Sequence, residues 1–267
     1  MSRTVLIDAD IFAYIASSAT EGVFYFNGGD SPPAVDENLE EALAMAERDI
    51  EAVANKLKAD RIIVCLTDDI DLTTNTVNNF RVDVYQPYKS KRLATRKPST
   101  LLRVKEFYAE RYECYQRPRL EADDCMGILA THTTLVPGEK IIVSGDKDMQ
   151  TIPGLLFNPK KDKRKPRVIT ELDADRYFME QALTGDTTDG YPGCRGIGPE
   201  SPFVAAVRQA KSLRSMWNIV LAGYESKGFT PEDALAQARC ARILRASDWD
   251  FQARKPRLWT PPTESRA

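Results

Sequence analysis

The sequence predicts an α/β protein whose parallel sheet is covered by helices on both faces, followed by a helical C-terminal part. Three short β-branched runs in the first 150 residues indicate buried strands, at residues 4–7, 61–66 and 140–143. Amphipathic helical patterns alternate with these runs, and only helical patterns follow residue 170. Such alternation of strands and helices is typical of a sheet with helices on both faces.

The remaining elements are justified by the apolar periodicity and by turn residues. Residues 23–26, followed by Asn27-Gly28-Gly29, indicate a hairpin arm. Helices are expected at 38–58, 100–111, 121–133, 171–183, 201–210, 213–224 and 231–245. Residues 71–98 are strongly basic and have no continuous apolar period, and loops of this length are usually functional. We expect an α/β core over residues 1–183 and a helical part over residues 184–267.

Composition excludes several protein classes. The chain has 267 residues, of which 42% are hydrophobic and 28% are charged, as in ordinary globular proteins. Its longest aliphatic runs are about five residues, whereas a membrane-spanning helix needs about 20. Asp8 and Asp10 interrupt the stretch that a secretory signal would need. We therefore expect no membrane partner and a cytoplasmic location.

The cysteine and histidine content argues against several catalytic schemes. The five cysteines include no Cys-x-x-Cys pair, so structural zinc is not expected. Any Ser-His-Asp or Cys-His scheme would have to use His132, the single histidine, which fits a solvent-facing or capping role better. The chain also has no Gly-x-x-x-x-Gly-Lys-Ser/Thr motif, so use of ATP is not expected.

Charge is segregated along the chain despite a formal net charge of −2. Residues 81–119 contain eleven Lys or Arg against four Asp or Glu, and residues 160–167 contain six basic residues against one acidic residue. A solvated helix face explains any one such run. Basic strips beside an acidic pocket, however, predict an anionic polymer as partner, with metal ions between the two.

Each predicted strand runs directly into acidic residues. The three pairs are Asp8 and Asp10, Asp68 and Asp69, and Asp146 and Asp148. Two further groups are Glu121, Asp123 and Asp124 at the start of a helix, and Asp186 and Asp189 in a Gly-Asp-Thr-Thr-Asp-Gly stretch. The ends of parallel strands share one edge of the sheet, where open α/β folds place their ligands. Residues 121 and 124 also share a helix face.

Taken one at a time, these acidic groups fit ordinary turn formers and helix caps. Taken together, they predict metal binding, because two unit charges about 5 Å apart repel by about 3 kcal/mol at an effective dielectric constant of about 20. Several such pairs cost on the order of 10 kcal/mol, as much as the stability of a domain. Oxygen ligands without cysteine or histidine select Mg²⁺ or Mn²⁺, and two such ions are the usual device for in-line attack on a phosphodiester.

Six short motifs follow one another in a fixed order: Ile7-Asp8-Ala9-Asp10, Leu66-Thr67-Asp68, Tyr88-Lys89-x-x-Arg92, Glu121-Ala122-Asp123-Asp124, Ser144-Gly145-Asp146-Lys147-Asp148 and Gly185-Asp186-x-x-Asp189-Gly190. In this order they resemble the motifs of the 5′ nuclease, or flap endonuclease, superfamily. Residues 241–259 are more particularly similar to the 5′ to 3′ exonucleases encoded by gene 6 of T7-type bacteriophages. The resemblance covers about residues 4–260. It implies a PIN-like core with a helical arch at about residues 78–98 and a C-terminal helix-three-turn-helix part.

The resemblance also implies roles for individual residues. Two metal ions would be surrounded by Asp8, Asp10, Asp68, Glu121, Asp123, Asp124, Asp146, Asp148, Asp186 and Asp189. Catalytic roles fall to Lys89, Arg92 and Asp146, with Lys89 and Arg92 matching residues that steady the scissile phosphate. DNA contacts are expected from Tyr88, Lys89, Lys91, Arg92, Lys160, Lys161, Lys163, Gly193, Gly196 and Gly198. The turn at residues 193–198 resembles a duplex-binding turn that often holds K⁺.

The function that follows is metal-dependent 5′ to 3′ hydrolysis of double-stranded DNA from its 5′ ends, in phage replication or recombination. RNA in RNA–DNA hybrids, as in primer removal, follows from the resemblance alone. The alternatives are a structure-specific flap endonuclease and a non-catalytic DNA-binding module. If the chain is phage-encoded, the expected location is the host cytoplasm. Its protein partners and oligomeric state do not follow from the sequence.

Overall fold

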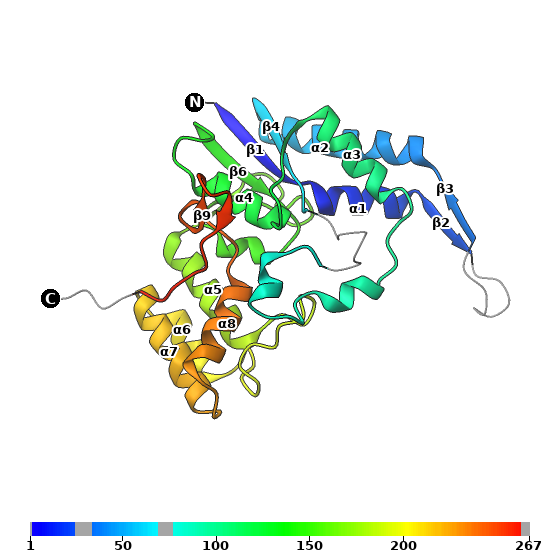
Figure 1. Ribbon diagram of the computed structural model, residues 1–267. Coiled ribbons are helices and arrows are strands. Elements are labelled where there is room, and N and C mark those ends of the chain that lie inside the picture. The colour runs from blue at the N-terminus through cyan, green and yellow to red at the C-terminus, as the bar shows by residue number, and fades with distance from the viewer. Residues whose placement is uncertain (1, 25–33, 69–76, 263–267) are drawn as a thin grey trace.

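The structure is a computed structural model that describes residues 2–24, 34–68 and 77–262 (Figure 1). Its centre is a six-stranded sheet with the order β5-β4-β1-β6-β7-β8. The strands are β1 (Arg3–Asp8), β4 (Arg61–Cys65), β5 (Glu113–Tyr115), β6 (Glu139–Val143), β7 (Gly154–Phe157) and β8 (Arg167–Ile169). The paired strands are parallel from β5 to β7, and β8 is antiparallel to β7. The predicted parallel core is confirmed.

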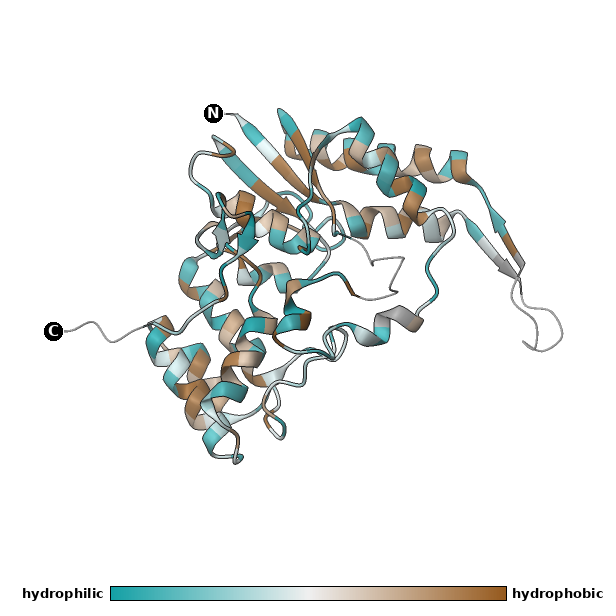
Figure 2. Ribbon diagram, in the orientation of Figure 1, coloured by the Kyte–Doolittle hydropathy of each residue, from teal (hydrophilic) through white to brown (hydrophobic). Residues whose placement is uncertain are grey.

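Strand β1 lies at the centre of the sheet, between β4 and β6. Ile7 lies opposite Val64 on one side and Val143 on the other, and Asp8 lies opposite Cys65. All three strands begin with polar residues and continue with buried aliphatic residues, so Figure 2 shows them changing from teal to brown. The three strands predicted from the sequence are thus confirmed, and their carboxyl ends lie at one edge.

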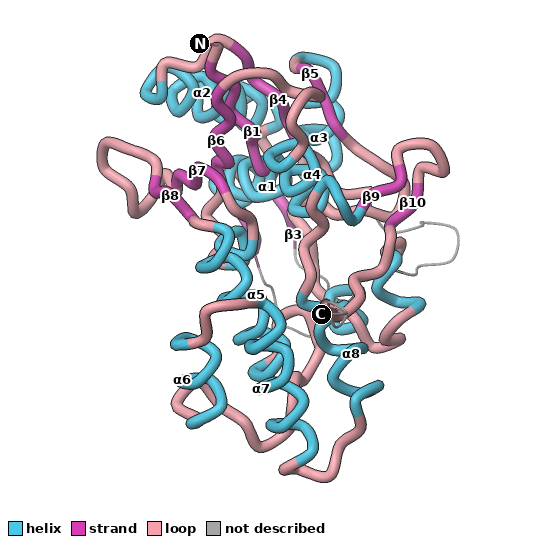
Figure 3. Tube along the Cα trace, turned by 90° about the vertical axis from the view of Figure 1, so that its left-hand side faces the viewer, coloured by secondary structure: helices cyan, strands magenta, loops and turns pink. Residues whose placement is uncertain are grey.

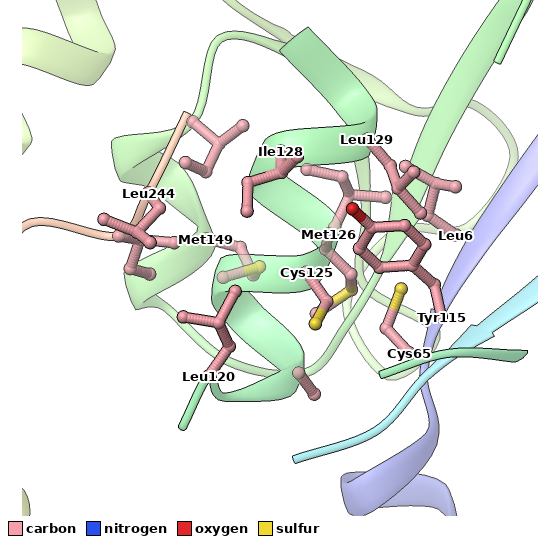
Figure 4. Close-up of a cluster of buried hydrophobic side chains, with 14 of the residues drawn as sticks. Leu6, Cys65, Tyr115, Leu120, Cys125, Met126, Ile128, Leu129, Met149 and Leu244 are labelled. Atoms are coloured by element: carbon pink, nitrogen blue, oxygen red, sulfur yellow. The ribbon is translucent and has the colours of Figure 1, made fainter. Parts of the chain in front are cut away.

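Alternate side chains of β1 pack into different layers, because side chains in a strand alternate between the two faces of the sheet. Val5 and Ile7 belong to a hydrophobic cluster with α1 (Ala9–Ala19), α2 (Leu39–Leu57) and α3 (Leu101–Arg111). Leu6 belongs to a second cluster, which includes Met126 and Leu129 of α4 (Ala122–Thr131) (Figure 4). The helices expected near α2, α3 and α4 are confirmed, and α1 was not predicted.

Four helices form a layer below the sheet in Figures 1 and 3. They are α5 (Glu171–Thr184), α6 (Pro202–Gln209), α7 (Leu213–Glu225) and α8 (Pro231–Ala241), which share one hydrophobic cluster. Each begins after a serine or threonine whose hydroxyl accepts a backbone hydrogen bond from the first turn, the preferred N-cap arrangement. All four predicted helices are confirmed. The proposed division at residue 183 stays a prediction, as does the helix-three-turn-helix.

Helix α8 ends at Ala241, not at Arg245 as the periodicity predicted. The backbone after Ala241 is extended, because its polar groups bind partners outside the helix. The carbonyl of Arg242 accepts a hydrogen bond from Arg81, and the N–H of Leu244 donates to Asp124. These contacts replace the hydrogen bonds that would have continued the helix.

The predicted hairpin arm and the basic stretch 71–98 lie partly in the segments 25–33 and 69–76, outside the described residues. Strands β2 (Glu21–Phe24) and β3 (Ala34–Glu37) pair antiparallel, which confirms the hairpin arm, although Asn27-Gly28-Gly29 is not described. The arch segment at 78–98 contains two 3₁₀ helices, η2 (Phe80–Asp83) and η3 (Ser90–Ala94). No helix in the described parts of the chain is both long and apolar enough to cross a bilayer.

Candidate active site

The central strands bring two acidic motifs together at the edge of the sheet. Asp8, the last residue of β1, caps α1 by accepting a hydrogen bond from the N–H of Ile11. Ser144, directly after β6, donates its hydroxyl to Asp8 at 2.6 Å and accepts from the N–H of Asp146 at 3.0 Å. One serine therefore holds the carboxyl ends of β1 and β6 in register. Asp8 and Asp146 lie together, as the strand order predicts.

Asp10 and Asp68 already have polar partners. Asp10 forms an ion pair with the buried ammonium group of Lys105 on α3, at 2.9 Å. Asp68 accepts hydrogen bonds from the side-chain amide of Asn78 at 2.6 Å and from the N–H of Arg119 at 2.7 Å. Both carboxylates therefore link the sheet edge to the segments around it. Asp69 lies outside the described residues.

The acidic start of α4 surrounds a buried arginine of η2. Arg81 donates to both carboxylate oxygens of Asp124, at 2.7 and 2.8 Å, and to Glu121 at 3.2 Å. Asp124 is fully buried and accepts a further hydrogen bond from the N–H of Leu244 at 3.0 Å. Glu121 and Asp124 thus face the same way, as their spacing predicts. In this structure both oxygens of the Asp124 carboxylate accept hydrogen bonds from Arg81.

Tyr88 and Lys89 are buried between two carboxylates. The hydroxyl of Tyr88 donates to Glu121 at 2.8 Å and lies 3.2 Å from Asp189. The ammonium group of Lys89 pairs with Glu121 and lies 3.5 Å from Asp189. Burial opposes ionisation of Glu121, but Lys89 and Arg81 lower its pKa to about 2. Tyr88 and Lys89 thus join the arch segment to the acidic motifs.

The acidic pair Asp146 and Asp148 and the acidic pair Asp186 and Asp189 are connected through α5 and Lys147. Asp148 accepts a hydrogen bond from the side-chain amide of Gln181 at 2.7 Å. Asp186 accepts from the ammonium group of Lys147 at 3.1 Å and from the N–H of Thr188 at 2.7 Å. Lys147 lies between Asp146 and Asp148 in the sequence. It therefore connects their segment to the segment that contains Asp186.

Several of these carboxylates repel one another. Burial raises the pKa of Asp8 to about 7, and the charge of Asp146 contributes to this rise. Burial and then the charge of Asp146 raise the pKa of Asp148 to about 7 as well. Burial, with repulsion from Asp8 and Asp146, raises the pKa of Asp123 well above its ordinary value. The sheet edge therefore concentrates negative charge that the protein itself does not fully neutralise.

Two cavities open beside this edge. The larger, about 940 Å³, is lined by α1 and α2, including Val53, by Phe157 at the end of β7, and by Asp146. The smaller, about 230 Å³, is lined by Lys89 and Glu121 among others. Acidic residues are therefore reachable from the surface on two sides.

The predicted basic DNA contacts lie on two segments. Lys91 is exposed in η3, and the side chain of Arg92 lies outside what the structure describes. Lys160, Lys161 and Lys163 are exposed on the loop between β7 and β8. The backbone of this loop donates hydrogen bonds to the side chains of Asn158 and Asp162. The role of its lysines in DNA binding stays a prediction.

The three predicted glycines differ in their surroundings. The N–H of Gly193 donates to the side chain of Gln237 at 2.9 Å, and a Cβ at Gly193 would lie 2.3 Å from the backbone nitrogen of Gly185. Gly193 therefore allows two backbone segments to pack. Gly196 and Gly198 are exposed, and a Cβ at Gly198 would meet no atom within 4 Å. The role of these two glycines in DNA binding stays a prediction.

Residues 4–164 match the family model described as the 5′–3′ exonuclease N-terminal, resolvase-like domain. The chain belongs to the 5′–3′ exonuclease family. Over 230 residues this exonuclease is 28% identical to the exonuclease of Escherichia phage T7, covering 75% of this chain and 74% of that protein. The resemblance inferred from the six motifs is confirmed, and the chain is a hydrolase acting as a 5′ to 3′ nuclease on DNA.

Two crystal structures of the T5 D15 protein share the fold of this exonuclease. One, co-crystallised with metal ions, superimposes with a TM-score of 0.63 at 13% identity and covers 90% of this chain and 89% of that one. The other, a flap endonuclease complex with DNA and metal ions, has a TM-score of 0.58 at 14% identity and covers 90% and 93%. The predicted fold class is thus confirmed.

The oxygen atoms of the acidic residues decide whether the exonuclease site suits a metal ion. In the described part of the chain, no three carboxylate, imidazole or thiol groups converge into a ready metal-binding cluster. Within that same part, Asp8, Asp123 and Asp146 form no ion pair with lysine or arginine. Their oxygens are the donors that hard divalent cations prefer. The donor set therefore fits such a cation, although the side chains do not yet converge on one point.

Sequence reasoning missed four polar residues of the exonuclease site: Arg81, Lys105, Ser144 and Gln181. Lys105 carried a usable signal, because it stands beside Val104 on the apolar face that Val104 and Tyr108 define in α3. A basic residue on a buried helix face needs an acidic partner. Arg81 carried no comparable signal, since it lies in a segment without apolar periodicity.

Proposed function

We propose that this exonuclease removes nucleotides from the 5′ ends of double-stranded DNA in a reaction that requires Mg²⁺ or Mn²⁺. The products would carry 5′-phosphate and 3′-hydroxyl groups. The observation that carries this proposal is the set of mutually repelling carboxylates at the sheet edge, with pKa values raised by burial and by one another. A divalent cation is the natural partner of such a set.

Six carboxylates of the predicted set would hold the cations. They are Asp8, Asp123, Asp146, Asp148, Asp186 and Asp189. Asp10, Asp68, Glu121 and Asp124 complete the predicted acidic set, and their contacts with lysine, arginine and amide groups fix the surrounding backbone. Two bound ions would supply activation of the attacking water and stabilisation of the leaving 3′ oxygen.

The protein's own cations then steady the phosphate. Lys89 lies at the junction of the smaller cavity and the acidic group, next to Glu121. When a phosphate enters, its oxygens compete with Glu121 and Asp189 for the ammonium group, and Tyr88 keeps Glu121 in place through its hydroxyl. A preorganised positive charge of this kind stabilises the charge that develops on the phosphoryl oxygens. Arg92 is assigned the same role from its place in the motif.

Duplex DNA would reach the site across two surfaces. The exposed lysines of the β7–β8 loop supply sequence-independent phosphate contacts. The turn at residues 193–198 supplies exposed backbone at Gly196 and Gly198 before α6. A K⁺ ion at this turn and activity on RNA–DNA hybrids remain part of the proposal through the family resemblance.

The deciding experiment uses a duplex labelled at its 5′ end, incubated with the protein and Mg²⁺, and resolves the products by size. Labelled mononucleotides released first support the proposal, and a chelator should abolish them. Labelled oligonucleotides from a flapped substrate, without mononucleotides from the blunt duplex, would instead indicate a structure-specific flap endonuclease. Binding without any cleavage would indicate a non-catalytic DNA-binding module.

A further inference from the structure

Arg81 lies where three parts of the fold meet. It belongs to η2 in the arch segment, its side chain is 2% exposed, and it contacts both the start of α4 and the end of α8. In the sequence, Arg81 is one member of a basic run. Its surroundings show a specific role.

All the polar contacts of the Arg81 guanidinium are made inside the protein. Besides the fork on Asp124 and the contact with Glu121, it donates to the backbone carbonyl of Cys240 at 3.1 Å and to that of Arg242 at 2.6 Å. The ring of Phe80 lies 4.5 Å from its central carbon. Five hydrogen bonds and the rings of Phe80 and Tyr88 therefore surround the guanidinium.

We propose that Arg81 is a positioning residue for DNA hydrolysis, which fixes the acidic start of α4 against the end of α8. Asp123 stands between Glu121 and Asp124 in the chain, so the two side chains that Arg81 holds determine where the first turn of α4 lies. From that turn Asp123 lines a small cavity together with Glu121 and Asp148. A small shift of α4 would move Asp123 relative to Asp148.

The arrangement is favourable because two helix ends meet at the guanidinium. The carbonyls of Cys240 and Arg242 belong to the C-terminal end of α8, where the last carbonyls have no partner within the helix. The carboxylates belong to the N-terminal end of α4, where negative charge is stabilised by the helix dipole. Arg81 therefore lies between the negative end of one helix and the acidic residues of another.

A lysine cannot replace this arginine. The planar guanidinium presents five N–H donors in a rigid fork, which suits one bidentate carboxylate and further acceptors in the same plane, whereas an ammonium group is a compact point charge. The contacts of Arg81 use this geometry in full. Arg81→Lys therefore keeps the buried positive charge and removes the fork, which separates geometry from charge.

Hydrogen bonds around Arg81 also connect the core to the helical C-terminal part. Asp124 accepts from the N–H of Leu244, just beyond α8, while Arg81 holds the carbonyls on the other side of the same segment. The acidic start of α4 and the end of α8 thus share one hydrogen-bonded unit. Displacement of that unit changes the acidic site and the C-terminal helices together.

The test compares Arg81→Lys with Arg176→Lys. Arg176 is the control, because it also donates to a backbone carbonyl, that of Ala210 at 2.9 Å, and to a carboxylate, that of Asp173 at 3.1 Å, and in the described part of the chain it bonds to none of the acidic site residues. Single-turnover rates and KM on 5′-labelled duplex would be measured with saturating Mg²⁺, well below the melting temperatures. Mn²⁺ affinity would be measured without DNA by electron paramagnetic resonance.

We expect Arg81→Lys to lower the single-turnover rate at least tenfold, to change KM less than threefold and to weaken Mn²⁺ binding at least fivefold. Arg176→Lys should stay within twofold of the parent in all three. A purely structural role predicts a lower melting temperature for Arg81→Lys with unchanged rate and Mn²⁺ affinity, and that result would overturn the proposal. If Arg81→Lys does not fold, Arg81→Gln, which keeps a planar N–H donor and leaves Asp124 in place, is compared with Arg176→Gln, and the same criteria apply.

This inference rests on the proposed metal-dependent hydrolysis, and the two can fail separately. If the parent protein neither cleaves DNA nor binds Mn²⁺, the proposed function has failed and the positioning role fails with it. If the parent does both and Arg81→Lys matches it, the positioning role alone has failed.

Discussion

Lys89 and Glu121 form a buried ion pair in which each side chain is 10% exposed. Replacing Lys89 removes a positive charge from the proposed phosphate site. A preorganised donor that acts on developing charge contributes about 3 kcal/mol in the transition state, which corresponds to a rate loss of about 100-fold. We expect Lys89→Ala to lower the single-turnover rate by about this factor and to change the Kd for duplex much less. A loss confined to Kd would make Lys89 an ordinary phosphate contact.

Asp123→Asn and Asp124→Asn should both lower kcat by at least about 100-fold, because each changes the acidic site. Their stabilities should differ. Among the described residues, Asp124 is the only carboxylate that accepts hydrogen bonds from both branches of the Arg81 fork. Asp124→Asn leaves the buried arginine without this charged partner, which lowers the free energy of unfolding by about 3 kcal/mol. Asp123→Asn removes a charge that burial disfavours, so its metal-free stability should be unchanged or higher. Urea unfolding with chelator measures this difference, and equal losses would contradict it.

The sheet edge could be predicted because every central strand runs directly into acidic residues. Parallel strands all end on one side, so the pattern itself places Asp8 and Asp146 together. Helix α1 was missed because its buried face consists largely of small residues, Ala9, Ala13 and Ala16, which give little apolar periodicity. Short strands such as β8 were missed for a similar reason, since three residues carry no measurable alternation.

The buried contacts of the acidic residues could not be predicted from the sequence. The fork between Arg81 and Asp124 depends on where α8 ends, and the apolar periodicity of residues 231–245 continues past that end. Tertiary hydrogen bonds to the backbone of Arg242 and Leu244 decide the boundary. A helix boundary set by a side chain more than a hundred residues away has no local signal.

The metal-free protein should lose stability as pH rises from about 4 to about 7. In the folded state the pKa of Asp148 is about 7, above its ordinary value of 3.8, because burial and then Asp146 disfavour the charged form. The folded state therefore holds this proton more tightly than the unfolded chain. The resulting stabilisation is complete below pH 3.8 and is lost as pH rises through 7.

Asp148→Asn should remove part of this pH dependence. One such carboxyl contributes a slope of at most about 1.4 kcal/mol per pH unit. Asp8, whose pKa is also about 7, keeps a slope in the mutant. Unfolding in urea with chelator, at half-unit steps from pH 4 to 8, gives the two curves. Parallel curves for parent and mutant would show that Asp148 titrates normally in the folded protein.

Gly193 and Gly198 should respond differently to substitution. Gly193→Ala places a Cβ 2.3 Å from the Gly185 nitrogen at a φ of +61°, so we expect it to lower the melting temperature markedly. Gly198→Val meets no nearby atom and should leave the melting temperature within about 1 °C. It should nevertheless weaken duplex binding several-fold, because the side chain blocks close approach to the backbone. Unchanged binding by Gly198→Val would remove this turn from the DNA-binding surface.

The variant Asp146→Asn distinguishes two roles of Asp146, as a metal ligand or as the acceptor in a structural turn. The Asp146 carboxylate accepts a hydrogen bond from the N–H of Asp148 at 2.8 Å, so a structural role is available to it. Its charge also raises the pKa of Asp8, Asp123 and Asp148, which shows that it repels all three. Asparagine keeps the shape and the acceptor and removes the charge. Without metal, the mutant should therefore gain roughly 1 to 3 kcal/mol of stability by the pairwise Coulomb estimate.

The same mutant should lose part of the stabilisation that Mg²⁺ gives the parent, because that stabilisation depends on metal affinity. Thermal unfolding with chelator and with saturating Mg²⁺ measures both effects. Asp162→Asn is the control, since Asp162 accepts from the N–H of Asn158 at 2.7 Å in a loop turn and pairs with Arg167, and it is not one of the predicted metal ligands. The control should lower stability equally with and without Mg²⁺, as expected for loss of an ion-pair partner. If Asp146→Asn behaves like this control, Asp146 holds a turn, and the carboxylates at the sheet edge do not form a metal-dependent active site.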